Sequence, residues 1–165
     1  MRETLRSIFP ALSAIQPPGT LEGGDICNAD GHFFIGISRR TNPEGARQLA
    51  DWLAPLGYTS SLVDVRGLPG LLHLKTGFSY AGGRRLVVVG PVAEGNTFDG
   101  FDVIRALPDE EPAANVLWIN ERVLITAGCP NLQRALRAAG CAPFPVDTSE
   151  FRKMDGSLTC LSLRF

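Results

Sequence analysis

Three side chains far apart in the sequence together have the chemistry of a nucleophilic catalyst. Cys160 is a thiol close to the end of the chain, His73 is a potential base, and Glu22 is an acid next to a Gly-Gly pair. A cysteine nucleophile needs a lowered pKa or an adjacent base, and the base in turn needs a group that orients it. The three residues satisfy this pattern if the fold brings them together.

Each of these residues also has a structural interpretation. Cysteines are often buried as small hydrophobic residues, and a lone histidine in an apolar run is often a satisfied core residue. His73 lies in the apolar, strand-like run Leu71–Thr76, whereas His32 follows an Asp-Gly turn and is expected to face solvent. Residues alone therefore leave open both a Cys/His enzyme and a protein without catalytic activity.

The loop around Glu22 contains further candidates. Glu22 and Asp25 flank Gly23 and Gly24, and such glycines let the backbone approach another group closely. The same glycines also fit an ordinary turn, and the two acids also fit capping positions. Arg40, at the end of an expected strand, is suited to holding a substrate carboxylate, although an exposed basic residue on a loop is the common alternative.

Length and composition favour one soluble domain over residues 1–165. The net charge is −1, which argues against nucleic acid or an anionic membrane as the main partner. No apolar run approaches the ~20 residues that span a bilayer, and no signal peptide is recognisable, so we expect a cytoplasmic protein. The four cysteines have no CxxC spacing and are expected as free thiols, without a disulfide or a metal site.

The chain reads as a repeat of ββαβ modules. Hairpin-like segments recur at roughly 40–55 residues, each followed by a helix and a further strand, which predicts modules at 20–65, 71–107 and 114–165. Residues 1–15 are expected to form an amphipathic helix. Residues 157–165 alternate like a strand and would place Cys160 in a packed C-terminal strand. An ordinary α+β sheet with similar hairpins by chance is the alternative.

Five ordered motifs make the resemblance to a known family specific. They are Gly19-Thr-Leu-Glu-Gly-Gly-Asp25, Phe34-Ile-Gly-Ile-Ser-Arg-Arg-Thr-Asn42, Leu72-His-Leu-Lys-Thr76, Ala113-Ala-Asn-Val116 and Asp147-Thr-Ser-Glu-Phe-Arg-Lys-Met-Asp-Gly-Ser-Leu-Thr-Cys160. The chain resembles dimethylarginine dimethylaminohydrolase, a family of guanidino-modifying enzymes. The resemblance implies an α/β-propeller (pentein fold) of ββαβ modules, with about three of five blades present here.

The resemblance also implies roles for individual residues. Cys160 resembles the nucleophile, His73 the general acid/base and Glu22 the acid that orients the histidine. Further positions resemble the substrate-binding set, which comprises Arg40, Met154, Asp25 and Asp155. No cofactor or metal is implied. The implied substrate is a methylated arginine, hydrolysed to citrulline and an amine through a thiouronium on Cys160.

Two departures from the family pattern bear on activity. Lys75 stands where arginine deiminases have an aspartate, which favours a methylated substrate over a deiminase-like reaction on arginine. The chain is also shorter than the family, whose preceding modules supply part of the guanidinium pocket. Three explanations of the shorter length are open. The chain is a fragment, it assembles with itself (a homo-oligomer) or with another chain, or it is an inactive relic that acts as a binding protein.

Overall fold

The computed structural model describes residues 2–9, 11–96 and 98–162, and three similar three-stranded sheets form its centre. In each sheet the first two strands form an antiparallel hairpin, and the third strand joins parallel to the second. The strands are β1 (Ile26–Ala29), β2 (His32–Ile37), β3 (Thr59–Asp64), β4 (Phe78–Tyr80), β5 (Arg85–Val89), β6 (Asp102–Ala106), β7 (Leu117–Ile119), β8 (Arg122–Thr126) and β9 (Pro143–Val146).

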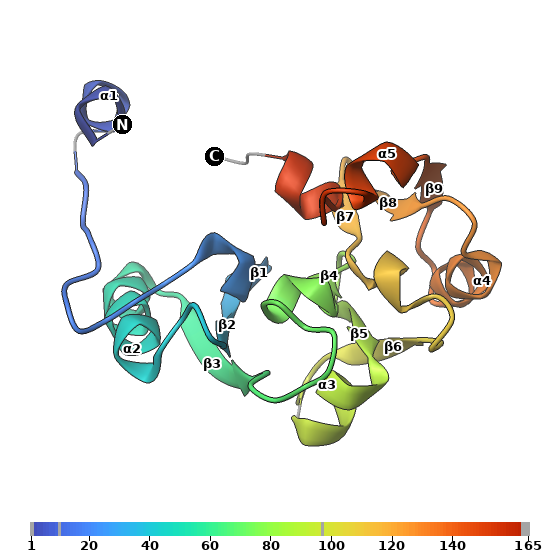
Figure 1. The fold of residues 1–165 in the computed structure, drawn as a ribbon, viewed down its shortest axis with the longest axis horizontal. Coiled ribbons are helices and arrows are strands. Elements are labelled where there is room, and N and C mark those ends of the chain that lie inside the picture. The colour runs from blue at the N-terminus through green and yellow to red at the C-terminus, as the bar shows by residue number, and fades with distance from the viewer. Residues whose placement is uncertain (1, 10, 97, 163–165) are drawn as a thin grey trace.

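A helix connects the second and third strands of each sheet. The helices are α1 (Arg2–Ile8), α2 (Pro43–Leu53), α3 (Gly90–Gly95), α4 (Pro130–Ala138) and α5 (Ser149–Arg152), of which α2, α3 and α4 are these connections. Figure 1 shows the three ββαβ modules following one another around an arc, with α2, α3 and α4 on the outside. The predicted α/β architecture of ββαβ modules is confirmed.

Local sequence explains how the hairpins turn. Asp30 and Gly31 have φ of 55° and 88°, and Asn120 and Glu121 have φ of 48° and 61°. Two successive residues with positive φ give the turn whose twist matches that of a two-stranded hairpin, and Asp, Asn and Gly tolerate this conformation best. The hairpin turns predicted from these residues are therefore present.

Neighbouring residues in the sequence also determine where α2 starts. Asn42 has an extended backbone, and its side chain accepts a hydrogen bond from the backbone N–H of Gly45, while Pro43 occupies the first helical turn. Both features are preferred at helix starts, because the first N–H groups of a helix have no partner within it. The helix buries Ala46 against Ile35 and Ile37 of β2.

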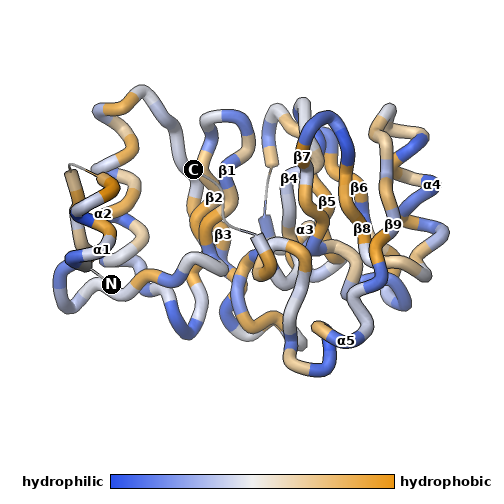
Figure 2. The backbone as a smooth tube through the Cα atoms, turned by 90° about the horizontal axis from the view of Figure 1, so that it is seen from above, coloured by the Kyte–Doolittle hydropathy of each residue, from blue (hydrophilic) through white to orange (hydrophobic). Residues whose placement is uncertain are grey.

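One hydrophobic core runs through all three modules. It includes Val63 of the first module, Val87 of the second and Val123 of the third. Figure 2 shows the apolar positions gathered along the strands. Aromatic pairs cross the two junctions between modules, with ring centroids 5.0 Å apart for Phe34 and Phe78 and 5.7 Å apart for Tyr80 and Trp118. The sheets are thus packed against each other as well as following each other in sequence.

A buried carboxylate also joins the first two modules. Asp25 is 0% exposed, and it accepts hydrogen bonds from Ser38 Oγ (2.7 Å), Thr41 Oγ1 (2.7 Å) and the backbone N–H of Leu74 (2.8 Å). Gly36 makes room for this contact, since a Cβ there would lie 2.7 Å from Leu74 Cβ and 2.8 Å from Asp25 Oδ1. The carboxylate therefore fixes the segment that contains His73 to the end of β2.

Two terminal predictions are wrong in extent or kind. Helix α1 ends at Ile8 instead of residue 15, and Figure 1 shows it away from the three sheets. The predicted C-terminal strand is absent from the described part of residues 157–165, where a 3₁₀ turn covers Leu158–Leu161. Residues 163–165 of that predicted strand lie outside the described residues. Within the described ranges, no helix is long and apolar enough to span a membrane.

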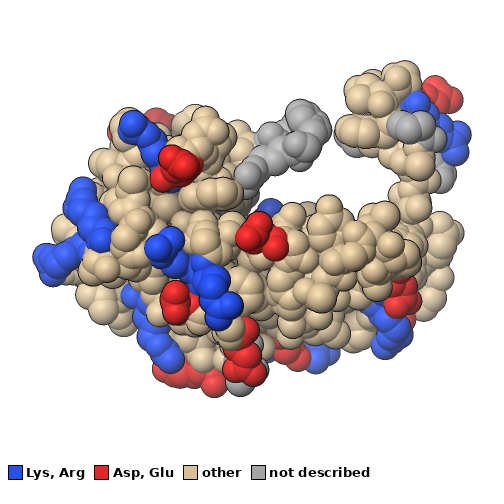
Figure 3. All heavy atoms as spheres, turned by 180° about the vertical axis from the view of Figure 1, so that it is seen from behind, with Lys and Arg blue, Asp and Glu red and all other residues tan. Residues whose placement is uncertain are grey.

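Charged side chains are mixed on the surface. Figure 3 shows Lys and Arg interspersed with Asp and Glu on the face opposite to that of Figure 1. The exposed ion pairs include Arg66 with Asp64 (2.5 Å) and Lys153 with Glu150 (2.7 Å). The Arg66 guanidinium lowers the pKa of the Asp64 carboxyl by hydrogen bonding to it. This face carries no large area of a single sign.

We predict that Asp25→Ala destabilises the chain by about 3 kcal/mol or more, because three buried donors lose their acceptor. Urea unfolding measures the change. Asp51→Ala, at an exposed position of α2, is the matched control and should stay within about 0.5 kcal/mol of wild type. Equal unfolding midpoints for Asp25→Ala and Asp51→Ala would show that the carboxylate does not hold the modules together.

Candidate active site

His73 lies before a turn instead of within a strand, which corrects the prediction. Its backbone is extended, with φ −158° and ψ 173°, and the 3₁₀ turn Leu74–Thr76 follows directly. We call residues 73–76 the His73 turn. Two contacts fix this turn to the first module. The backbone N–H of Leu74 donates to the Asp25 carboxylate, and the Leu74 side chain is fully buried. Tertiary contacts therefore override the apolar, strand-like sequence.

The imidazole of His73 is positioned on two sides. Its Nδ1 lies 3.3 Å from Thr76 Oγ1, within the His73 turn. Its ring packs on the backbone of Gly24, where an added Cβ would lie 2.5 Å from His73 Cδ2 and 2.7 Å from Nε2. The close approach that the Gly-Gly pair suggested is therefore made by Gly24, and the group that approaches is the candidate base.

Glu22 and Arg40 pair with each other in this structure. Arg40 Nη1 lies 3.1 Å from Glu22 Oε2, and the two side chains are 49% and 36% exposed. Among the described residues no hydrogen bond joins Glu22 to His73, whose Nδ1 meets Thr76 instead. The expected orienting contact is therefore not formed here, although Glu22 lies on the same loop as Gly24.

Cys160 is exposed and belongs to a turn, not to the packed tail that its sequence predicted. We call residues 157–161 the Cys160 turn. The carbonyl of Ser157 accepts the backbone N–H groups of Cys160 (2.9 Å) and Leu161 (3.2 Å). The Ser157 hydroxyl lies 3.3 Å from Cys160 Sγ. The Asn115 side chain, 44 residues earlier in the sequence, accepts the backbone N–H of Thr159 (2.9 Å), and so a turn forms where alternation suggested a strand.

A hollow of about 380 Å³ lies between the two turns. His73 and Thr76 line it from one side and Asp155 and Ser157 from the other, together with Asn115 and Arg152. Cys160 itself is not one of the lining residues, but its Sγ lies 3.3 Å from the hydroxyl of Ser157, which is. We call this space the His73 hollow. The structure therefore brings the candidate base and the segment before the candidate nucleophile to one cavity.

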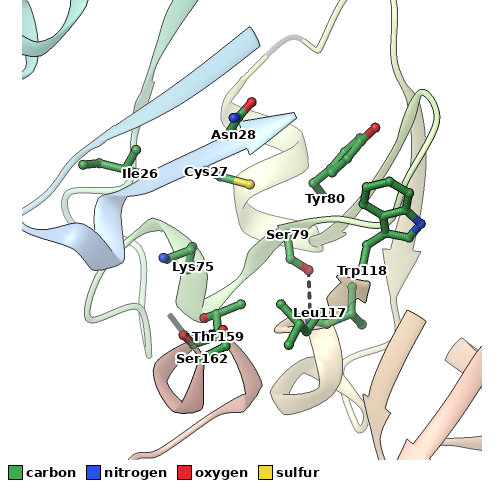
Figure 4. Close-up of a pocket in the computed structure, with 11 residues that line it drawn as sticks. Ile26, Cys27, Asn28, Lys75, Ser79, Tyr80, Leu117, Trp118, Thr159 and Ser162 are labelled. Carbon is green, nitrogen blue, oxygen red and sulfur yellow. Dashed lines mark hydrogen bonds between the residues drawn. The ribbon is translucent and has the colours of Figure 1, made fainter. Parts of the chain in front are cut away.

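A second hollow of about 260 Å³ lies between the first strands of the three sheets. Residues of β1, β4 and β7 line it, together with Lys75 and with Thr159 of the Cys160 turn. Figure 4 shows Lys75, Ser79 and Thr159 on the walls of this space. Lys75 thus follows His73 in sequence by two residues but lines a different hollow.

The remaining predicted site residues have different surroundings. Asp155 lines the His73 hollow with a positive φ of 55°, and Met154 is 86% exposed. Asp25 was expected to bind substrate, but its carboxylate is enclosed by protein donors. His32 was expected to face solvent, but in β2 its ring contacts Thr59 Oγ1 (2.7 Å) and Ser61 Oγ (3.0 Å), and burial lowers its pKa.

Sequence reasoning missed several residues of the site. Thr76, Asn115, Arg152 and Ser157 line the His73 hollow, yet none was assigned a role. All four lie in motifs of the resemblance, and Asn115 in Ala113-Ala-Asn-Val116 carried a further signal. Asparagine between small apolar residues is costly to bury unless it is fully hydrogen bonded.

The four thiols differ in exposure. Cys27 and Cys129 are buried, Cys141 is partly buried and Cys160 is exposed, and none of these described cysteines forms a disulfide. Burial raises the pKa of the Cys129 and Cys141 thiols. Because the thiolate is the reactive form, both should react slowly near neutral pH. No cluster of His, Cys, Asp and Glu suited to a metal ion occurs among the described residues.

The fold and the site define a class, which is an α/β-propeller assembled from ββαβ modules with a histidine and the turn that carries a cysteine at one cavity. An arginine dihydrolase from cyanobacteria has this fold, with a TM-score of 0.82 over 99% of this chain at 21% identity. No known protein-family model matches the chain.

The particular resemblance is to dimethylarginine dimethylaminohydrolase. The Pseudomonas aeruginosa enzyme is 41% identical over 166 residues, covering all of this chain, and the Streptomyces coelicolor enzyme is 30% identical over 164 residues. A solved structure of the Pseudomonas enzyme, a Cys-to-Ser mutant complexed with citrulline, has a TM-score of 0.87 at 41% identity and covers 99% of this chain. The resemblance read from the sequence is confirmed. The chain spans 64% and 62% of the lengths of the two relatives.

We predict that Gly24→Ala displaces the His73 ring, because the new methyl group would overlap it. The chain has two histidines, so the ring resonances of His73 can be assigned by NMR. Gly23→Ala is the matched control, since nothing lies within 4 Å of a Cβ added there. Unchanged His73 resonances in Gly24→Ala would contradict the contact.

Thiol labelling gives a second prediction. Iodoacetamide near pH 7.5 should modify Cys160 before the other three cysteines, because Cys160 is exposed and burial raises the pKa of Cys129 and Cys141. Peptide mass spectrometry after short exposures measures the order. Labelling spread equally over the four cysteines would contradict it.

Proposed function

We propose that the chain is a hydrolase, or the catalytic portion of one, that acts on the guanidinium group of Nω-methylated arginine and releases citrulline and an alkylamine. The observation that carries the proposal is the 41% identity along the whole chain to an enzyme of this name, combined with the His73 and Cys160 turns at one hollow. The catalytic residues are Cys160 and His73.

The chemistry needs one nucleophile and one group that moves protons. The Cys160 thiolate attacks the guanidinium carbon, and a cationic substrate next to it favours the thiolate. His73 protonates the departing amine, which leaves a thiouronium on Cys160. His73 then takes a proton from water, the hydroxide adds to the same carbon, and the thiolate leaves as citrulline forms.

In this proposal the Glu22–Arg40 ion pair separates when substrate binds, and each side chain then takes up its role in the reaction. An exposed pair of this kind contributes only about 0–1 kcal/mol, so a substrate α-carboxylate can replace Glu22 on Arg40. Glu22 is then available to orient His73, whose ring packs on the neighbouring Gly24. In this proposal Arg40 binds the carboxylate and Glu22 assists the base.

Two further residues complete the proposed substrate contacts. Asp155 lines the His73 hollow and supplies a carboxylate to a cationic group of the substrate. The exposed Met154 presents its backbone carbonyl to the substrate α-amino group. Asp25 positions the His73 turn from beneath, since its oxygens accept hydrogen bonds from Ser38, Thr41 and Leu74.

Deiminase-like hydrolysis of unmethylated arginine is the second candidate activity. Against it stands Lys75, whose position holds an aspartate in arginine deiminases and whose side chain here lines the hollow between the inner strands. A cation at this position offers no contact to an unsubstituted guanidinium nitrogen. Rates with arginine and with asymmetric dimethylarginine separate the two activities.

The cellular location and the oligomeric state of the protein are part of the same proposal. Four cysteines without a disulfide support a location in the cytoplasm. Assembly with itself stays a prediction. Light scattering on the purified chain tests it, and a mass equal to the 17.8 kDa of one chain would contradict it.

We predict that the purified chain releases citrulline from asymmetric dimethylarginine and that Cys160→Ser lowers kcat by about 10³-fold or more, because the nucleophile is lost. Cys141→Ser is the matched control and should change kcat less than about 3-fold, since Cys141 lies in the third module against the carbonyl of Ala81. A colorimetric citrulline assay measures both variants.

Two results would contradict this proposal in different ways. Citrulline formation that persists in Cys160→Ser would exclude Cys160 as the nucleophile. A folded wild-type chain that releases no citrulline from any methylarginine or from arginine would show that these 165 residues are not a competent enzyme, as a binding protein would behave.

A further inference from the structure

Asn115 is a buried polar residue between the two turns of the candidate site. It is 2% exposed and follows the 3₁₀ turn Glu111–Ala114, directly before β7 begins. The catalytic chemistry proposed above gives it no role. A buried side-chain amide is costly unless its donors and its acceptor are all used, so its partners indicate what it does.

All three of its hydrogen bonds go to the His73 and Cys160 turns. Asn115 Nδ2 donates to the carbonyl of Lys75 (2.7 Å) and to Thr159 Oγ1 (2.8 Å). Asn115 Oδ1 accepts the backbone N–H of Thr159 (2.9 Å). Lys75 is two residues after His73, and Thr159 is the residue before Cys160. One amide therefore connects the backbone near the candidate base with the backbone near the candidate nucleophile.

The amide is itself held in place. The Ser79 hydroxyl donates to the carbonyl of Ala114 and accepts the backbone N–H of Val116 (3.0 Å), so both neighbours of Asn115 are fixed to β4. Figure 4 shows Ser79 between the strand that carries it and the chain leading into β7, with Lys75 and Thr159 nearby. The connection thus reaches from the second module to the start of the third.

We propose that Asn115 is the positioning residue of the site, whose amide sets how far apart, and in which orientation, His73 and Cys160 are held. The proposal rests on the proposed function for its catalytic meaning and on the three hydrogen bonds for its structural content. Reactions between positioned groups are sensitive to displacements of about 1 Å, which can cost about 10²-fold in rate. Two turns of a few residues each have no strand pairing of their own to maintain such a distance.

Two substitutions separate the hydrogen bond to the His73 turn from the hydrogen bonds to the Cys160 turn. Asn115→Ala removes all three hydrogen bonds. Asn115→Asp keeps an acceptor for the Thr159 N–H but has no donor for the Lys75 carbonyl when it is ionised. Asn115→Asp should therefore release the His73 turn and retain the Cys160 turn, whereas Asn115→Ala should release both.

Hydrogen–deuterium exchange at pH 8 measures this directly. We expect Asn115→Ala to speed exchange by about 10-fold or more both in residues 73–76 and in residues 157–161, and Asn115→Asp to speed it in residues 73–76 alone. Leu136→Ala is the control for general destabilisation, because Leu136 is fully buried in α4. At an equal loss of melting temperature it should leave the relative exchange of the two turns unchanged.

Citrulline kinetics test the catalytic part. Asn115→Ala should lower kcat by about 10²-fold with a smaller change in KM, and the folded Leu136→Ala variant should keep kcat within about 3-fold of wild type. If Asn115→Ala does not fold, Thr159→Val serves instead, since it removes only the Oγ1 contact and should lower kcat by a smaller factor.

The two assays separate failure of this inference from failure of the proposed function. Unchanged exchange in both turns of Asn115→Ala would overturn the inference, as would an unchanged kcat. Equal effects of Leu136→Ala on the turns would show that Asn115 acts only on overall stability. If wild type forms no citrulline, the proposed function fails, and hydrogen exchange alone still decides whether Asn115 couples the turns.

Discussion

The buried carboxylate of Asp25 is the interaction on which the arrangement of the site depends. Its oxygens accept from Ser38 and Thr41 at the end of β2 and from Leu74 in the His73 turn. The hydrogen bond to Leu74 spans 49 residues of sequence and crosses from the first module to the second. Without it, the loop that presents Gly24 to the imidazole and the turn that carries the imidazole would have no common anchor.

Repetition in the sequence predicted the fold well, and the reasons are local. Hairpin turns with residues that tolerate positive φ, and helix starts such as Asn42-Pro43, specify each ββαβ module separately. The conformations around His73 and Cys160 were predicted wrongly as strands, because alternation of apolar residues does not register hydrogen bonds from distant residues. Asp25 and Asn115 make those bonds, and both turns follow from them.

In the candidate site, too, some features could be predicted from the sequence and others depend on contacts between distant residues. The identities of Cys160 and His73 follow from the resemblance, and the Gly-Gly pair indicated a close approach that Gly24 makes. The pairing of Glu22 with Arg40 did not follow from sequence, because two exposed side chains can adopt several partners. The pair occupies the two groups to which the proposed reaction assigns substrate binding and orientation of the base, and in that proposal the one step is coupled to the other.

Capture of the covalent intermediate tests the central claim most directly, that Cys160 attacks the guanidinium carbon of a methylated arginine. The chain is mixed with asymmetric dimethylarginine, quenched in acid during turnover and analysed by peptide mass spectrometry. The account predicts an adduct with the mass of the substrate less dimethylamine, confined to the peptide that contains Cys160. Citrulline formation without any adduct, or an adduct on Cys27, Cys129 or Cys141, would contradict it.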